Sequence, residues 1–174
     1  IQFKLNEMNS ENVRLKDMPE EWFVLPDEAS MENGMIASVA VFAANRLMDS
    51  HKFEEADRLM KQLLSKDNGI IGAHRGLMIC DRLFIELIGE NRKDIIEKLY
   101  TKEQQKFMKT MGSFISVART EYVYALFNEK DDEKIKKCRE RFEKIAKNWP
   151  YNTDAQSERE LVAIAESRFE EVNG

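Results

Sequence analysis

Several features are scarce in this 174-residue chain, and each scarcity argues against a class of protein. The only two cysteines, Cys80 and Cys138, lie far apart, so neither a disulfide framework nor a CxxC redox pair is expected. No apolar run reaches the roughly 18 to 20 residues of a membrane span, and no signal-peptide pattern is present. We therefore expect a soluble, cytoplasmic chain that does not itself insert into a membrane.

Proline and glycine are also rare, with three and seven residues, which argues against long disordered segments. Charge of one sign is not concentrated anywhere. The 27 basic residues are scattered among 32 acidic ones, and the net charge is −5. Such a chain has no basic face for a phosphate backbone, so a nucleic acid is not an expected partner. Apolar residues are abundant, at 43% of the chain, and a chain of this length and composition can form one domain with a packed core.

The first 26 residues differ from the rest of the chain. They show no sustained helical period and contain Pro19 and Pro26, which disfavour helix at the preceding residues. We expect 1–26 to be an irregular lead-in or linker, packed onto the domain through Trp22 and Phe23. Residues 27–174 then form the domain.

From residue 27 onward, apolar residues recur at helical spacing and the interruptions are short. No segment shows the alternation of a strand, which predicts an all-α fold of about seven or eight helices. The expected helices span 35–49, 53–64, 71–87, 93–100, 102–110, 113–128, 132–147 and 154–171.

Helix ends give local signals as well. Thr101 with Gln104, and Thr153 with Gln156, match the capping box, in which a Thr side chain caps the helix and a Gln reaches back to it. Gly69 is placed to end the helix over 53–64 in a left-handed conformation.

The helical hairpins recur every 39 residues or so, with equivalent points at Phe53, Lys93 and Asp132. A period of about 34 to 47 residues is typical of α-solenoids. The segment "KFEEADRLMKQLL" resembles the second helix of a tetratricopeptide repeat, with an aromatic residue at the turn (Phe53) and a small residue on the packing face (Ala56). The later units carry larger residues at the small position and longer turns. The resemblance implies a tetratricopeptide-like superhelix.

A second resemblance covers the whole chain. The segments "PEEWF", "FEEADRLM", "YTKEQQKFMKTM" and "RTEYVYALFNEKD" are similar to the soluble tail of bacterial membrane-embedded zinc peptidases of the site-2 protease family. That family carries a catalytic HExxH motif in an upstream membrane helix, and neither histidine here begins such a motif. The resemblance implies a non-catalytic cytoplasmic tail, tethered to the membrane in the full-length protein. The absence of an initial methionine fits a chain cut from a longer protein.

Polar residues within otherwise apolar helices are the candidate binding residues: Asn45, Arg75, Asp81, Arg119 and Tyr122. In a tetratricopeptide array the first helices line a concave groove, and Asn45 falls where that family often has an asparagine that holds a ligand backbone. The alternative is internal pairing, with Arg75 or Arg119 bound to Asp81, because buried charges need partners.

A metal or nucleophilic site is not expected. His74 and Cys80 are six residues apart on one helix and point to different faces, and His51 lies in a turn. Cys80 and Asp81 are adjacent and diverge by about 100°. We therefore expect no enzyme activity in this chain, no cofactor and no metal. The expected function is a protein or peptide interaction module with a regulatory role, whose oligomeric state the sequence leaves open. The alternative is a free-standing helical-repeat protein that binds a peptide or small molecule in its groove.

Overall fold

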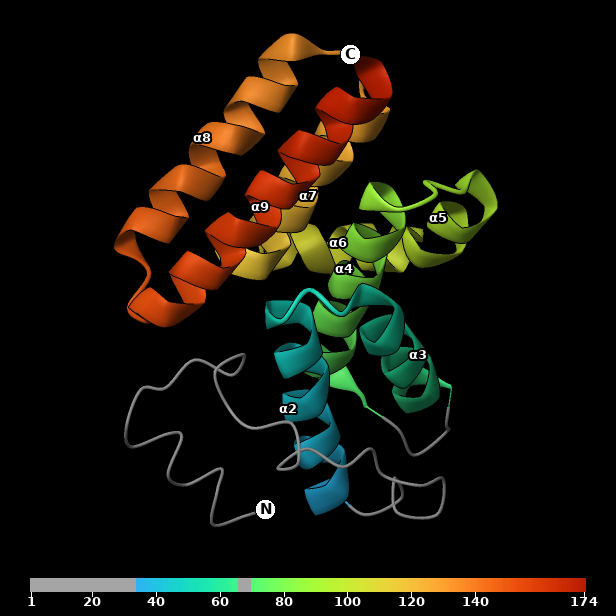
Figure 1. Ribbon diagram of the computed structural model, residues 1–174. Helices are drawn as coiled ribbons and strands as arrows, with labels where there is room; N and C mark the ends of the chain where they lie inside the picture. The colour runs from blue at the N-terminus through green and yellow to red at the C-terminus, as the bar shows by residue number, and fades with distance from the viewer. Residues whose placement is uncertain (1–33, 66–69) are drawn as a thin grey trace. The chain divides into compact units, whose positions relative to one another are not determined.

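The structure, a computed structural model, describes residues 34–65 and 70–174. The expectations for 1–26, for Trp22 and Phe23, and for the cap at Gly69 lie outside these residues. The described residues form eight helices and no strand, so the predicted all-α class is confirmed (Figure 1). The helices are α2 (Gly34–Asp49), α3 (Phe53–Leu64), α4 (Gly72–Ile88), α5 (Lys93–Leu99), α6 (Lys102–Thr110), α7 (Ile115–Asn128), α8 (Asp132–Asn148) and α9 (Asn152–Asn173).

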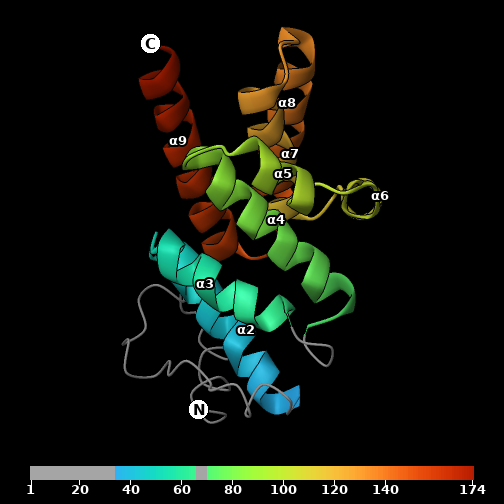
Figure 2. The same cartoon turned by 90° about the vertical axis from the view of Figure 1, so that its right-hand side faces the viewer.

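The described residues divide into two compact units, with the boundary between Arg75 and Gly76 inside α4. In the first unit α2 and α3 form a hairpin (Figure 2). Its turn is closed by His51, whose φ of 62° is left-handed. The N–H groups of His51 and Lys52 donate to the carbonyls of Met48 and Leu47. This is the Schellman pattern that ends many helices, here with a histidine where glycine is usual.

The inner face of α3 has the spacing that the sequence predicts. Ala56, Leu59, Met60 and Leu63 are all buried, at intervals of three, one and three residues. Ala56 is completely buried, so the small side chain lies at a packed face as the tetratricopeptide-like pattern expects. Acidic residues occupy the first turn of α3 and a lysine its last turn, which suits the helix dipole.

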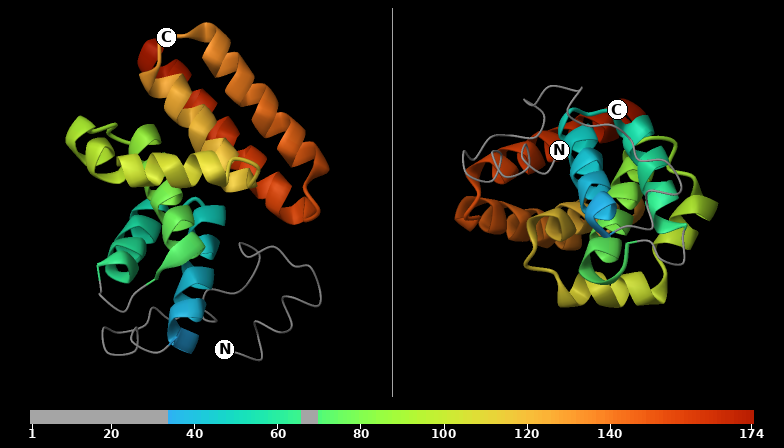
Figure 3. Two further views of the ribbon diagram at one scale, coloured as in Figure 1. Left: turned by 180° about the vertical axis from the view of Figure 1, so that it is seen from behind. Right: turned by 90° about the horizontal axis from the view of Figure 1, so that it is seen from below.

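In the second unit, the long helices α8 and α9 lie along α7 and also contact each other (Figure 3). Helix α7 is buried on nearly every side, and its buried residues include polar as well as apolar ones. Two aromatic pairs lie near the C-terminal end of α7: Phe127 meets Phe169 of α9 edge-on, with ring centroids 5.5 Å apart, and Tyr124 stacks on Tyr100 at 4.2 Å.

Helices α4 and α6 approach closely at Gly76. A Cβ atom there would overlap the ring of Phe107, so a glycine is required by packing rather than by backbone conformation. The side chain of Gln104, also on α6, donates from Nε2 to the carbonyl oxygen of Gly76 across 2.9 Å. The contact between α4 and α6 therefore consists of the Phe107 ring packed on Gly76 and a buried hydrogen bond from Gln104 to the same residue.

The capping predictions succeed only in part. Thr101 accepts from the N–H of Gln104 at 3.1 Å, as predicted, but the Gln104 side chain turns into the core instead of reaching back. The second capping box is wrong: α9 begins at Asn152, and its cap residue Tyr151 makes no side-chain cap bond. An unpredicted cap is Asp131, whose carboxylate accepts from the N–H groups of Glu133 and Lys134 at the start of α8.

None of the helices in the part of the chain that the structure describes has the length and apolar character needed to cross a membrane.

Candidate functional site

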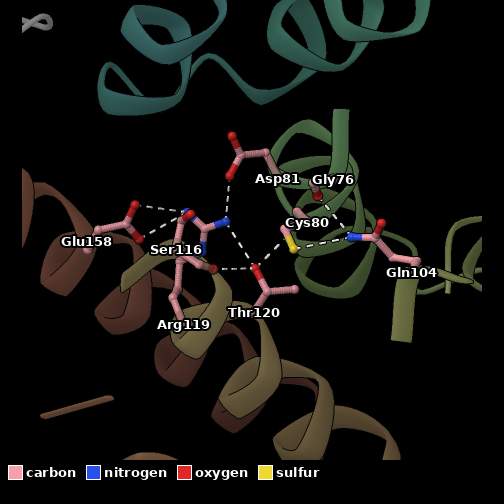
Figure 4. Close-up of polar contacts among 8 residues, drawn as sticks. All are labelled: Gly76, Cys80, Asp81, Gln104, Ser116, Arg119, Thr120 and Glu158. Atoms are coloured by element: carbon pink, nitrogen blue, oxygen red, sulfur yellow. Dashed lines mark hydrogen bonds and ion pairs between the residues drawn. The ribbon is translucent and has the colours of Figure 1, made fainter. Parts of the chain in front are cut away.

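Arg119 is the largest fully buried side chain of the described residues, with 1% of its surface exposed. It lies on α7, where its neighbours Ala118 and Thr120 are also buried. A guanidinium cannot lose its proton in a protein, so this charge must be balanced inside the fold. The balance comes from two carboxylates on other helices (Figure 4).

The two carboxylates bind different nitrogens of the guanidinium. Arg119 Nη2 donates to Asp81 Oδ1 on α4 across 2.6 Å. Arg119 Nη1 donates to both oxygens of Glu158 on α9, at 3.0 and 3.2 Å. One side chain therefore joins α4, α7 and α9 by charge-assisted hydrogen bonds, which are about twice as strong as neutral ones. We call Arg119, Asp81 and Glu158 the arginine cluster.

Further contacts hold the guanidinium in place. Nη2 also donates to the Thr120 hydroxyl at 3.0 Å, and that hydroxyl donates to the carbonyl oxygen of Ser116 at 2.9 Å. The carbon at the centre of the guanidinium lies 4.8 Å from the centroid of the Phe84 ring. Nε is buried and makes no hydrogen bond in the described structure.

The carboxylates share one positive charge, and this affects how they titrate. Burial raises the pKa of Glu158 to about 7, although Arg119 lowers it, and the nearby Asp81 raises it further. Burial lowers the pKa of Arg119, but Glu158 and Asp81 raise it above its ordinary value. The arginine cluster therefore carries a fixed cation and a carboxyl that can gain a proton near neutral pH.

Cys80 lies beside the arginine cluster and is fully buried. Its Sγ accepts a hydrogen bond from Gln104 Nε2 at 3.4 Å. Burial, with the negative charge of Asp81, raises the pKa of the Cys80 thiol to about 12. A thiol at this position stays protonated at neutral pH and is a weak nucleophile.

The structure brings together only some of the candidate binding residues that the sequence indicated. Asp81 and Arg119 are in direct contact, which is the internal-pairing alternative. Tyr122, 2% exposed, donates its hydroxyl to Glu166 Oε2 at 2.7 Å, one helical turn from Arg119. Arg75 and Asn45 belong to the other unit and are exposed. Arg75 Nη1 donates to the carbonyl oxygen of Leu64 at 3.2 Å.

Glu158 was missed at the sequence level, although a signal was present. It lies on the apolar stripe of α9, flanked at helical spacing by the buried Ala155, Leu161 and Val162. A carboxylate inside such a stripe needs a cation on a facing helix. Arg119 is such a cation.

A second feature of this unit is an open groove of about 770 Å³. One wall is the end of α6 with the turn after it, and the other is the C-terminal half of α8. The lining residues are Lys109, Thr110, Gly112, Ser113, Arg141, Lys144, Ile145, Asn148, Trp149 and Pro150. Three of them are cations and none is a carboxylate.

The lining of the groove includes two partly buried apolar residues, Ile145 and Trp149. The Trp149 ring meets Phe114 edge-on at 5.0 Å, which ties the groove to the start of α7. Burial raises the pKa of the Asp154 carboxyl, and the Trp149 indole lowers it in part. Among the cations, Arg141 donates to Glu121 Oε2 at 2.6 Å, whereas Lys109 and Lys144 have no carboxylate partner among the described residues.

Neither histidine belongs to the arginine cluster or to the lining of the groove. His51 and His74 are both exposed. Within 34–65 and 70–174, no group of three or more histidine, cysteine, aspartate or glutamate side chains is arranged to hold a metal ion.

Comparison with known proteins adds no relative: a scan against family models, a search of curated proteins and a search of solved structures each found no match.

Proposed function

We propose that this chain is a non-catalytic protein-interaction domain with a regulatory role, and that the groove between α6 and α8 is its binding surface. The observation that carries the proposal is the groove itself, which is open and is lined by two apolar residues, Ile145 and Trp149, together with polar and charged ones. Protein recognition commonly uses an aromatic anchor surrounded by polar groups.

The arginine cluster supports the proposal in another way. Its carboxylates bind the fully buried guanidinium, so we assign these three side chains to the scaffold rather than to ligand contacts. The cluster joins α4, α7 and α9, and a domain whose helices are already restrained loses less entropy when it binds a partner.

The alternative is binding of a small molecule. Small-molecule sites are usually enclosed and mostly apolar, with a few polar groups. This groove is open, and its rim carries Lys109, Arg141 and Lys144. These features favour an extended polypeptide.

The resemblances in the sequence extend the proposal. A tetratricopeptide-like hairpin at α2 and α3 and the similarity to site-2-protease tails favour a domain that regulates a membrane-embedded metallopeptidase on the same polypeptide. The coding sequence upstream of Ile1 tests this part. An open reading frame with membrane helices and HExxH supports it, and a start codon directly before Ile1 contradicts it.

The binding function is tested by selecting peptides from a random library on the purified chain. Gly112→Phe fills the groove, and Gly112→Ala is its matched control, since a Cβ at Gly112 meets its neighbours only at ordinary van der Waals distance. Selected peptides should bind the wild type and Gly112→Ala, and should lose affinity for Gly112→Phe. Failure to select any peptide that depends on the groove would contradict the proposal.

A further inference from the structure

The groove carries a charge opposite to that of the chain as a whole. The chain has a net charge of −5, yet the groove is lined by three cations and no carboxylate. Arg141 is bound to Glu121, so the available positive charge is that of Lys109 and Lys144. Lys109 lies in the last turn of α6, where the helix dipole alone favours a cation. Arg141 and Lys144 lie before the last turn of α8, so the dipole does not account for them.

From this charge we infer that the occupant of the groove is an extended acidic segment of another polypeptide, with two carboxylates flanking an apolar residue. The inference rests on the proposed function and specifies its ligand. The carboxylates would bind Lys109 and Lys144, which have no carboxylate partner among the described residues. The apolar side chain would lie on Ile145 and Trp149.

The length of the groove suits a short segment. From Arg141 to Asn148 the α8 backbone rises about 10 Å, which an extended chain covers with about three residues. A motif of acidic, apolar and acidic residues has this length.

The helix ends distinguish a peptide from a phosphate. The groove lies at the C-terminal ends of α6 and α8, where backbone carbonyl oxygens lack helical partners. These oxygens disfavour any anion, a carboxylate as well as a phosphate, but they accept hydrogen bonds from peptide N–H groups, which a free phosphate lacks. Arg141, the residue best suited to grip a phosphate, is already bound to Glu121. A polypeptide supplies both carboxylates and N–H donors, so it matches the groove better than a free phosphate.

The test measures binding of fluorescein-labelled peptides to the purified 174-residue chain by anisotropy. One peptide is Asp-Glu-Leu-Glu-Asp, and its neutral counterpart is Asn-Gln-Leu-Gln-Asn. The acidic peptide should bind at least about tenfold more tightly, and its affinity should fall as salt is added. Lys144→Glu and Lys109→Glu should each weaken it about tenfold.

The control is Lys136→Glu, which makes the same charge change at an exposed position of α8 outside the groove. It should leave the affinity nearly unchanged. The position of binding is read from the indole N–H signal of Trp149 in a proton–nitrogen spectrum, with Trp22→Phe used to assign the two tryptophans. This signal should shift with the acidic peptide.

Each contrary outcome has a distinct meaning. If library peptides need the groove but are not acidic, the inference is overturned and the proposed function stands. If no peptide depends on the groove, both are overturned. If inorganic phosphate, a single-stranded oligonucleotide or phosphatidylserine vesicles bind as tightly as the acidic peptide, the groove is a general anion site and the inference is overturned.

Discussion

Arg119 of α7 and Asp81 of α4 are 38 residues apart in sequence, and Nη2 of the arginine lies 2.6 Å from Oδ1 of the aspartate. The arginine is almost completely buried and the aspartate is 14% exposed. With Glu158 as the second acceptor, this contact fixes how α4, α7 and α9 meet in the second unit. The arginine cluster is therefore the structural centre from which stability predictions can be made.

Replacing Arg119 should be strongly destabilising. Arg119→Met leaves two partly buried carboxylates without a cation, which should lower the free energy of unfolding by up to about 3 kcal/mol. Urea denaturation followed by circular dichroism measures the change. Adding Asp81→Asn and Glu158→Gln to Arg119→Met removes the unpaired charges and should recover much of the loss. Equal stability of the single and triple variants would show that the charges are not coupled.

Stability should fall as the pH rises through neutrality. The pKa of Glu158 is raised to about 7, above the ordinary value of 4.5, chiefly by burial. Between these values the folded state holds a proton that the unfolded chain has released. The stabilising contribution is therefore complete below pH 4.5 and is lost as the pH rises through 7.

Urea midpoints measured from pH 5 to 8 test this pH dependence. Glu158→Gln cannot titrate, so its midpoint should decrease less than that of the wild type over the same interval. Parallel profiles for the two proteins would contradict the raised pKa.

Cys80 should be inert in the folded protein. The thiol is fully buried and its pKa is raised to about 12, so almost no thiolate exists at pH 8. In a Cys138→Ser background, Ellman's reagent should detect no thiol in the native state and one equivalent in guanidinium chloride. Rapid reaction without denaturant would mean that the core around Gln104 opens readily.

His51 should be replaceable by glycine with a gain in stability. Its left-handed φ of 62° is unfavourable for a residue with a Cβ. His51→Gly should raise the free energy of unfolding by about 0.5 to 1 kcal/mol, after allowing for the greater freedom of glycine in the unfolded chain. His51→Ala retains the Cβ and serves as the control. Thermal melts that rank alanine equal to glycine would exclude backbone strain as the cause.

The sequence predicts the helices well because apolar spacing is a local property. All eight described helices start and end close to their predicted positions, within one or two residues. The capping residues were less predictable. Gln104 makes its bonds to Gly76 and Cys80 on another helix, and these tertiary bonds replace the local bond to the cap.

The candidate site was predictable from the sequence only for charged residues in otherwise apolar helices, because such residues require a partner of opposite charge. The sequence indicated Arg75 or Arg119 as a partner of Asp81, and the structure has Arg119 in that place. The groove could not be found in this way. It is formed by the ends of α6 and α8, and residues such as Lys109 and Lys144 look like ordinary surface lysines until the tertiary structure places them along one channel.

Helix α9 has a consequence for the order in which the second unit can assemble. It supplies Glu158 and Glu166 to side chains of α7, and Arg168 Nε donates to the Ile88 carbonyl oxygen at the end of α4. During synthesis, α4 and α7 leave the ribosome before these partners exist. Arg119 can then bind Asp81 alone, and the core of the unit closes only after α9 has emerged.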